Sequence, residues 1–270
     1  MIKDKAAGIL PYMLIASGIA AVLVPYASSL EAARSASEAV SATSAGEEPD
    51  GESIAEAMRY NEALASGDMS GCVPYSRQLD ADGDGTMAVL EVPRIRAMLP
   101  VFHGSSDQVL AAGVGHVEGT ALPVGGTGTR CVLAGHTGDG LRVFDDIRLL
   151  EEGDRFIIWS AGQPFEYEVF SKETVLPEEA SMLAPLPGED ICTLVTCTPY
   201  GVNSHRLLVN GRRCAYSPAD SSVPADAGVY VNARTAPYAI CAVVAASALV
   251  TSVLWRRKHR SAGAARKRVI

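Results

Sequence analysis

Residues 191–213 read ICTLVTCTPYGVNSHRLLVNGRR, and this stretch contains two apolar runs separated by a polar turn. The first run, residues 191–195, is rich in β-branched side chains and predicts a buried strand. The segment Pro199-Tyr200-Gly201 predicts a turn or loop. A second apolar run at residues 207–209 predicts a return strand. We therefore expect a β-hairpin whose first strand carries Cys197 at its end.

The hairpin would bring a cation back towards the Cys197 thiol, because His205 and Arg206 precede the second apolar run. A thiol beside a cation loses its proton more readily, and the thiolate is the nucleophile. Neighbouring residues of a strand point to opposite faces, so only one of these two cations can face the thiol. The alternative is a buried core cysteine, which is the more common state of a single cysteine on an apolar strand.

Three ordered segments resemble the active-site signature of the sortases, and more narrowly of their class C, pilin-polymerising branch. The most specific is TLVTCTPYG at residues 193–201 with NSHRLLV at residues 203–209. The segments GVGHVEG and LPVGG, within residues 113–126, resemble the part of the family that precedes the catalytic histidine. LAGH at residues 133–136 resembles the end of the histidine strand. The resemblance extends over residues 86–216.

The resemblance implies a mainly β fold: a sortase-like eight-stranded β-barrel with short helices and an N-terminal helical segment, to which the apolar runs described below add two transmembrane helices. The many short apolar runs with Gly and Pro between them favour a β-barrel on their own. Residues 53–65 predict the N-terminal helix, with Ser53 and Glu56 as a capping box. The resemblance also makes Cys197 the catalytic nucleophile.

The base that would serve Cys197 must come from one of five histidines. His259 lies in a basic tail, and spacing alone does not separate His116 from His136. The resemblance selects His136, and it selects Arg206 as the catalytic cation.

The reaction that the resemblance implies is transpeptidation of a cell-wall sorting signal similar to Leu-Pro-x-Thr-Gly. The Cys197 thiolate attacks the threonine carbonyl, and His136 first protonates the departing amine and then serves as base for the incoming one. Arg206 donates charge-assisted hydrogen bonds to the substrate or the oxyanion. In the class C branch the incoming amine is a pilin lysine. Further expected substrate contacts are Thr196, Thr198, Tyr200 and Asn203.

A lid over the thiol is a feature of class C sortases, and Val73-Pro74-Tyr75 occupies the matching place. Pro74 and Tyr75 are therefore candidate lid residues. Val73 has no carboxylate, so this lid could not form an ion pair with the catalytic arginine. An ordinary surface loop is the alternative.

Residues 80–91 match the twelve-residue calcium loop D-x-D-x-D-G-x5-E. The residues that follow the Gly, however, alternate in the pattern of a strand, and an EF-hand needs a helix there. We favour a turn that leads into a strand, which would hold Glu91 away from an ion.

Charge is distributed unevenly along the 270 residues. Of the formal net charge of −8, residues 1–30 contribute +1 and residues 236–270 contribute +7, so residues 31–235 carry −16. An acidic middle argues against nucleic-acid binding. Residues 6–30 and 236–255 are apolar runs long enough to span a bilayer, although a cleaved signal peptide is the rival explanation of the first. Basic flanks place both ends in the cytoplasm.

These features predict a two-span cell-membrane protein with an extracellular catalytic domain. Its expected parts are a cytoplasmic N-terminus (1–5), a transmembrane anchor (6–30), a helical stalk with the lid-like loop (31–85), the catalytic barrel (86–215), a linker (216–235), a transmembrane helix (236–255) and a basic cytoplasmic tail (256–270).

No cofactor or metal is expected, because the sequence has no CxxC pair and its glycine-rich segment lacks phosphate-binding spacing. Cys131 and Cys192 precede His136 and Cys197 by five residues each, so the two sulfurs would be close if the strands are parallel neighbours, as in sortases. We favour free thiols over a disulfide, because disulfides between adjacent strands are geometrically awkward.

Three functions remain open at this stage. The first is a transpeptidase that polymerises pilins or surface-protein precursors at the cytoplasmic membrane. The second is a sortase that attaches surface proteins to a cell-wall precursor. The third, from a different class, is a tethered extracellular β-barrel that binds peptides without catalysis. A papain-like protease is disfavoured by the order of histidine before cysteine.

Overall fold

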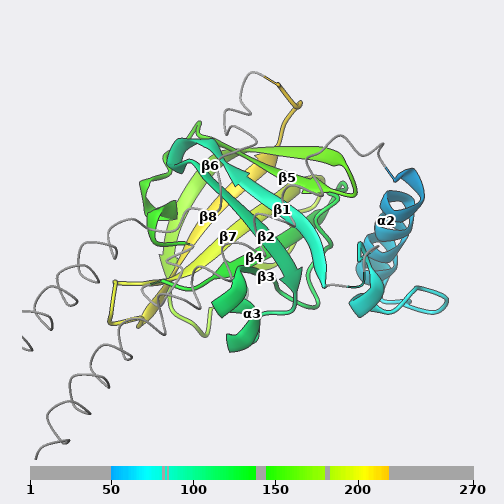
Figure 1. Cartoon of the computed structure of the whole chain (residues 1–270), viewed down its shortest axis with the longest axis horizontal. Helices are drawn as coiled ribbons and strands as arrows, with labels where there is room; N and C mark the ends of the chain where they lie inside the picture. The colour runs from blue at the N-terminus through cyan, green and yellow to red at the C-terminus, as the bar shows by residue number, and fades with distance from the viewer. Residues whose placement is uncertain (1–49, 81–82, 84, 138–143, 180–182, 219–270) are drawn as a thin grey trace, which may run out of the picture. The chain divides into compact units, whose positions relative to one another are not determined.

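A computed structural model describes residues 50–80, 83, 85–137, 144–179 and 183–218, all within one compact unit, Glu31–Val231. Eight strands close into a barrel in the order β1-β2-β3-β4-β7-β8-β6-β5 (Figure 1). Their bounds are β1 Thr86–Val92, β2 Ala97–His103, β3 Val114–His116, β4 Thr129–Gly135, β5 Arg155–Ser160, β6 Gln163–Val175, β7 Asp190–Thr198 and β8 His205–Arg213. The mainly β, eight-stranded barrel is thus confirmed.

Helices lie before the first strand and at a few places between the strands. The α-helices are α2, Gly51–Ser66, and α3, Asp107–Ala112; the 3-10 helices are Tyr75–Arg77, Pro93–Ile95 and Asp145–Leu149. The expected N-terminal helix is α2, but its N-cap differs from the prediction. The Asp50 carboxylate accepts from the backbone N–H groups of Glu52 and Ser53, and the Ser53 hydroxyl donates to the same carboxylate. The expected capping box at Ser53 is therefore wrong, because the acidic side chain three residues earlier already holds these donors.

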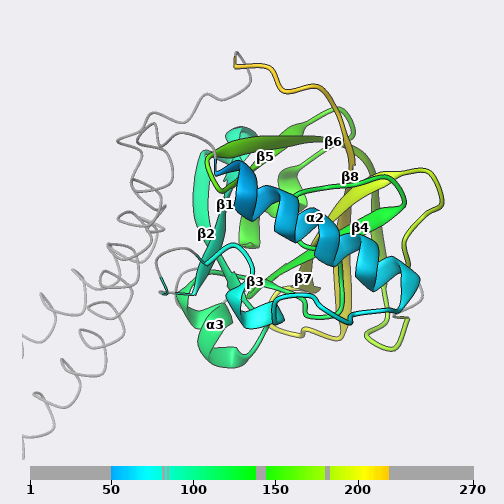
Figure 2. The same cartoon turned by 90° about the vertical axis from the view of Figure 1, so that its right-hand side faces the viewer.

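Helix α2 lies across the outside of the barrel (Figure 2). Its Ile54, Ala57 and Tyr60 are buried. The Asn61 amide is only 3% exposed, donates to the carbonyls of Leu122 and Gly125, and accepts from the Leu122 N–H. This side chain is fully satisfied, and it attaches the helix to the connection between β3 and β4.

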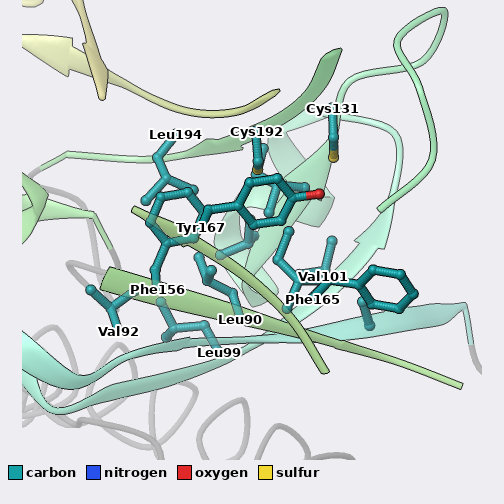
Figure 3. Packing of buried hydrophobic residues seen from close by; sticks show 14 of the residues in the cluster. Leu90, Val92, Leu99, Val101, Cys131, Phe156, Phe165, Tyr167, Cys192 and Leu194 are labelled. Carbon is teal, nitrogen blue, oxygen red and sulfur yellow. The ribbon is translucent and has the colours of Figure 1, made fainter. Parts of the chain in front are cut away.

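The barrel interior is filled by one side of each strand (Figure 3). On β7, Cys192 and Leu194 belong to the core cluster, and on β4 Cys131 and Leu133 do. Side chains alternate across a strand, so Thr193, Val195 and Cys197 lie on the outer face. The same alternation separates core residues from outer residues on β4 and β8.

The strand expected after the calcium-like loop is β1, as the alternating pattern predicted. Glu91 is 1% exposed on this strand, and its carboxylate accepts a 2.9 Å hydrogen bond from the Trp159 indole N–H on β5. Glu91 is thereby engaged within the barrel wall.

The structure has no helix, among the residues that it describes, with the length and apolar character needed to cross a bilayer. The two predicted spans, residues 6–30 and 236–255, lie outside the described residues.

Candidate active site

Cys197 and Arg206 face each other across the β7–β8 ladder. The antiparallel register pairs Cys197 with Arg206 and Thr198 with His205. Directly opposed residues in such a ladder project their side chains to the same face, so Arg206 shares the outer face of Cys197. The register agrees with the prediction that only one of His205 and Arg206 faces the thiol, because His205 points to the opposite face of the strand. Cys197 is partly buried, as is Arg206.

His136 joins this pair from a third strand. Strands β4 and β7 are parallel, and the last pair in their register is Gly135 with Thr196. His136 is the residue after Gly135, and Cys197 is the residue after Thr196. Adjacent parallel strands run in the same direction, so His136 and Cys197 follow this last pair at the same rim of the barrel.

Gly135 allows the end of β4, just before His136, to pack closely against a neighbouring aromatic ring. A Cβ at this position would come within 2.6 Å of the Phe144 ring, which is itself fully buried. The glycine lets the ring pack against the strand end, and the Phe144 N–H also donates to the His136 carbonyl. This contact holds the backbone that presents the imidazole.

Thr137 fastens the ends of β4 and β7 to each other. Its hydroxyl donates a 2.8 Å hydrogen bond to the Cys197 carbonyl and contacts the Thr196 hydroxyl. The Thr196 hydroxyl lies 2.8 Å from the Gly135 carbonyl. No local sequence pattern predicts this role of Thr137, because the role depends on a strand that is distant in the chain.

The Arg206 guanidinium is oriented by the loop between β7 and β8. One of its terminal nitrogens donates to the Asn203 carbonyl at 3.2 Å and to the His205 carbonyl at 3.1 Å. Asn203 has a φ of 58°, the left-handed conformation that asparagine tolerates better than most residues. Asn203 thus contributes through its backbone, and its predicted side-chain contact with substrate stays a prediction.

The other predicted substrate contacts surround a small pocket of about 40 Å³ at the rim. Its lining includes Thr196, Thr198 and Tyr200 beside Cys197. Thr196 is only 4% exposed, whereas Tyr200, in the loop between β7 and β8, is 57% exposed. Their contact with substrate stays a prediction.

The lid candidate Tyr75 is held against the barrel at β2 and β3. Its hydroxyl lies 2.9 Å from His116 Nδ1 and 3.2 Å from the His116 carbonyl, and it accepts from the Gly104 N–H. Its ring packs edge-on against His103, with centroids 5.1 Å apart. Pro74 precedes this residue on the surface. Whether the two residues cover the thiol stays a prediction.

His116 is the other histidine that spacing allowed, and its surroundings are those of a buried structural residue. It is fully buried, and its Nε2 lies 2.8 Å from the Ala121 carbonyl. Because Nε2 must donate to that carbonyl, Nδ1 accepts from the Tyr75 hydroxyl, and both ring nitrogens are used. His116 pairs with Leu133, three residues before His136 on β4. The geometry therefore favours His136 over His116.

Cys131 and Cys192 are register partners on β4 and β7, with both thiols free and buried in the barrel. Strands β4 and β7 are parallel neighbours, which is the condition under which the two sulfurs were expected to be close. The prediction that both thiols are free is confirmed. Burial raises the pKa of Cys192 well above its usual range. These inner thiols differ from Cys197, which lies on the outer face.

Comparison with known proteins identifies the family. The family model of the sortase domain matches residues 90–214. The crystal structure of sortase C-1 from Actinomyces oris is 42% identical, with a TM-score of 0.56, and the match covers 61% of this chain and 98% of that one. This chain belongs to the sortase family. A pilus-related sortase C of Group B Streptococcus is 37% identical, with a TM-score of 0.55, 61% of this chain and 89% of that one being covered.

Related sequences give the same family at lower coverage. Sortase SrtE1 of Streptomyces coelicolor is 32% identical over 151 residues, which are 51% of this chain and 43% of that protein. The chain spans between 43% and 62% of the length of the curated relatives that it matches. Sortases are cysteine transpeptidases, and this sortase brings a thiol, a guanidinium and an imidazole to one rim.

Proposed function

We propose that this sortase is a class C transpeptidase that cleaves an LPxTG-like sorting signal after threonine and joins the acyl group to a pilin lysine. The observation that carries the proposal is the pairing of Cys197 with Arg206 beside His136 at the end of parallel strands. The class C part rests on the sequence signature and on the likeness to the sortase C structures.

The reaction has two balanced halves. The Cys197 thiolate attacks the threonine carbonyl, and a thioester forms as the Thr–Gly amide bond breaks; His136 gives its proton to the departing glycine amine. The incoming lysine amine then gives a proton to His136, attacks the thioester and releases the thiolate. Each half regenerates the protonation state that the other half needs.

Arg206 is the electrostatic component of this proposal. Two carbonyls hold one of its terminal nitrogens, which fixes the plane of the guanidinium. A planar fork with fixed geometry can direct its remaining N–H groups at the threonine carbonyl as negative charge develops there. Preorganised donors of this kind contribute about 3–4 kcal/mol to catalysis.

The proposal includes a setting at the cell membrane, with residues 6–30 and 236–255 as spans and the barrel outside the cell. The partners would be pilins or surface-protein precursors that carry a sorting signal. A lid formed by Pro74 and Tyr75 would limit the access of water to the thioester.

The test is incubation of the full-length protein with candidate pilins, followed by denaturing electrophoresis. A ladder of covalent multimers is expected, and Cys197→Ala must abolish it. Transfer to a cell-wall precursor amine without a ladder would assign the anchoring reaction instead. Binding of a sorting peptide with no covalent product, and no protection of Cys197 against alkylation, would favour a non-catalytic binder.

A further inference from the structure

Two thiols face each other inside the barrel, on the side of the sheet opposite to the catalytic residues. Cys131 on β4 and Cys192 on β7 are register partners, and both side chains point into the core cluster (Figure 3). Cys131 is 2% exposed and Cys192 is fully buried. The two side chains hydrogen bond to each other. The transpeptidase mechanism uses neither sulfur, so the pair needs a separate explanation.

The two thiols differ in acidity. Burial raises the pKa of Cys131, but the hydrogen bond with Cys192 and the neighbouring His116 imidazole outweigh burial and bring this pKa from 9.0 down to about 6. Burial and the nearby Cys131 sulfur raise the pKa of Cys192 well above 9.0. A thiolate attacks an oxidant, and a protonated thiol beside it can then complete a disulfide. The pair therefore combines a nucleophilic thiol with a resolving thiol.

The backbone geometry permits a bond between these two sulfurs. Neighbouring strands lie about 4.8 Å apart, and the Cα atoms of a disulfide are usually about 4.4–6.8 Å apart. Cys131 and Cys192 are directly paired in the register and lie on the same face of the sheet. A disulfide between adjacent strands is strained, and strained disulfides are reduced more easily than relaxed ones. A cross-link at this position would thus form on oxidation and open again on reduction.

We propose that Cys131 and Cys192 form a peroxide-sensitive dithiol, which oxidation converts into a reversible disulfide between β4 and β7. The Cys131 thiolate attacks one oxygen of hydrogen peroxide, the O–O bond breaks, and a sulfenic acid and hydroxide are formed. The hydroxide takes up the proton that Cys131 had released. The Cys192 thiol then attacks the sulfenic sulfur, the S–S bond forms, and the hydroxyl group leaves with the thiol proton as water. In total, two thiols and one peroxide give one disulfide and two waters.

The oxidant has to be small, because both sulfurs lie inside a packed barrel. Hydrogen peroxide is little larger than water, and local opening of a fold admits molecules of this size. The Tyr75 ring packs against the core cluster, and its hydroxyl lies 2.9 Å from His116 Nδ1. Burial and, more weakly, the nearby Cys131 raise the pKa of Tyr75, which places this phenol close to the nucleophilic thiol. Movement of the Tyr75 segment would therefore open a path to Cys131.

The dithiol is connected to the active site by the two strands that it would join. Cys131 and Cys192 precede His136 and Cys197, respectively, by five residues each. A disulfide fixes the separation of β4 and β7 at this level, and the strands transmit the change to the rim. A displacement of about 1 Å between catalytic groups can lower the rate about a hundredfold. Oxidation should therefore slow peptide transfer. This consequence rests on the proposed function, whereas the thiol chemistry does not.

The first test uses full-length Cys197→Ala, in which the active-site thiol cannot react. Treatment with hydrogen peroxide, followed by alkylation under denaturing conditions and peptide mapping, should give a linked pair of peptides that contain Cys131 and Cys192. Dithiothreitol should release both peptides. In the control, Cys197→Ala combined with Cys192→Ala, Cys131 should stop at the sulfenic acid, which dimedone traps. Two free inner thiols after peroxide treatment, or a disulfide to Cys72 or Cys214 instead, would overturn the proposal. The decisive measurement needs no substitution in the core, so it stands even if the control does not fold.

The second test measures peptide transfer by wild-type protein and by Cys192→Ala after equal peroxide treatment. Oxidation of Cys197 lowers both activities to the same extent, so any further loss in the wild type reports the disulfide. We expect a further loss of about tenfold, restored by dithiothreitol. Equal losses, with the cross-link present, would overturn the connection to the active site. A cross-link in a protein that shows no transfer before oxidation would instead contradict the transpeptidase function and leave the dithiol in place.

Discussion

Arg206 lies directly opposite Cys197 in the antiparallel ladder between β7 and β8. The hairpin therefore determines their distance through main-chain hydrogen bonds, and the two carbonyls that hold the guanidinium determine its direction. An arginine in this setting can present two parallel N–H groups, which a lysine cannot do.

Arg206→Lys should lower kcat/KM for a sorting peptide by about 10²–10³-fold, because the fork is lost while the charge remains. The thermal midpoint should change little, since Arg206 is only partly buried at the rim. Initial rates of peptide transfer give kcat/KM, and a thermal unfolding curve gives the midpoint. Near-wild-type turnover of the lysine variant would refute the fork argument.

His136→Gln and His116→Gln should separate catalysis from stability. The first should abolish transfer, because the general acid and base is lost, and leave unfolding nearly unchanged. The second should retain activity in the folded fraction but destabilise the protein by about 1–3 kcal/mol, since buried partners such as Ala121 lose a donor or acceptor. Denaturant titration with activity measured on the same samples checks both. The reverse pattern would exchange the roles of the two histidines.

Gly135→Ala should destabilise the barrel by about 1–3 kcal/mol, because the new methyl group meets the buried Phe144 ring. The displaced strand end should also reduce peptide transfer. An alanine at Gly153 would be a poor control, because Gly153 has a positive φ. The control is Ala134→Ser, which lies on the same strand as Gly135. Equal stability of Gly135→Ala and wild type would show that the ring moves at no cost.

The lid hypothesis can be tested at Tyr75. Tyr75→Ala should speed the alkylation of Cys197 if the segment covers the thiol, while Tyr75→Phe, which keeps the ring, should alter the rate much less. Identical rates in all three proteins would remove Pro74 and Tyr75 from the candidate lid.

Stability at high pH should depend on the same phenol. Burial raises the pKa of Tyr75 from 10.0 to about 12. A raised pKa means that the folded state prefers the protonated phenol, so this contribution is complete below pH 10 and is lost as the pH rises towards 12. The free energy of unfolding should therefore fall more steeply over pH 10–12 in the wild type than in Tyr75→Phe. Parallel pH profiles would contradict this.

The hairpin and its chemistry could be predicted from the sequence because they are local. The alternation of His205 and Arg206 on a strand already restricts the cation that faces Cys197, and the register agrees with that restriction. The alternating residues after the calcium-like loop likewise predicted β1, where Glu91 accepts from Trp159.

The parts that sequence reasoning missed depend on residues distant in the chain. The hydrogen bonds of the buried Arg130 to Thr193 and Asn210 need the register of β4, β7 and β8 at once, and no local pattern marks a buried arginine that binds neutral acceptors. Thr137 gains its role only when β4 meets β7. The N-cap at Asp50 was missed for a simpler reason: two adjacent cap signals compete, and the carboxylate prevails.

Strands β4 and β7 are parallel, so the chain must leave the barrel rim at His136, build β5 and β6, and return before it can supply Cys197. The spacing of imidazole and sulfur is consequently independent of the length of that excursion. Insertions or replacements within it can alter recognition without disturbing the reactive groups. Such modularity offers a practical route to engineering: new specificity can be introduced by exchanging the crossover alone.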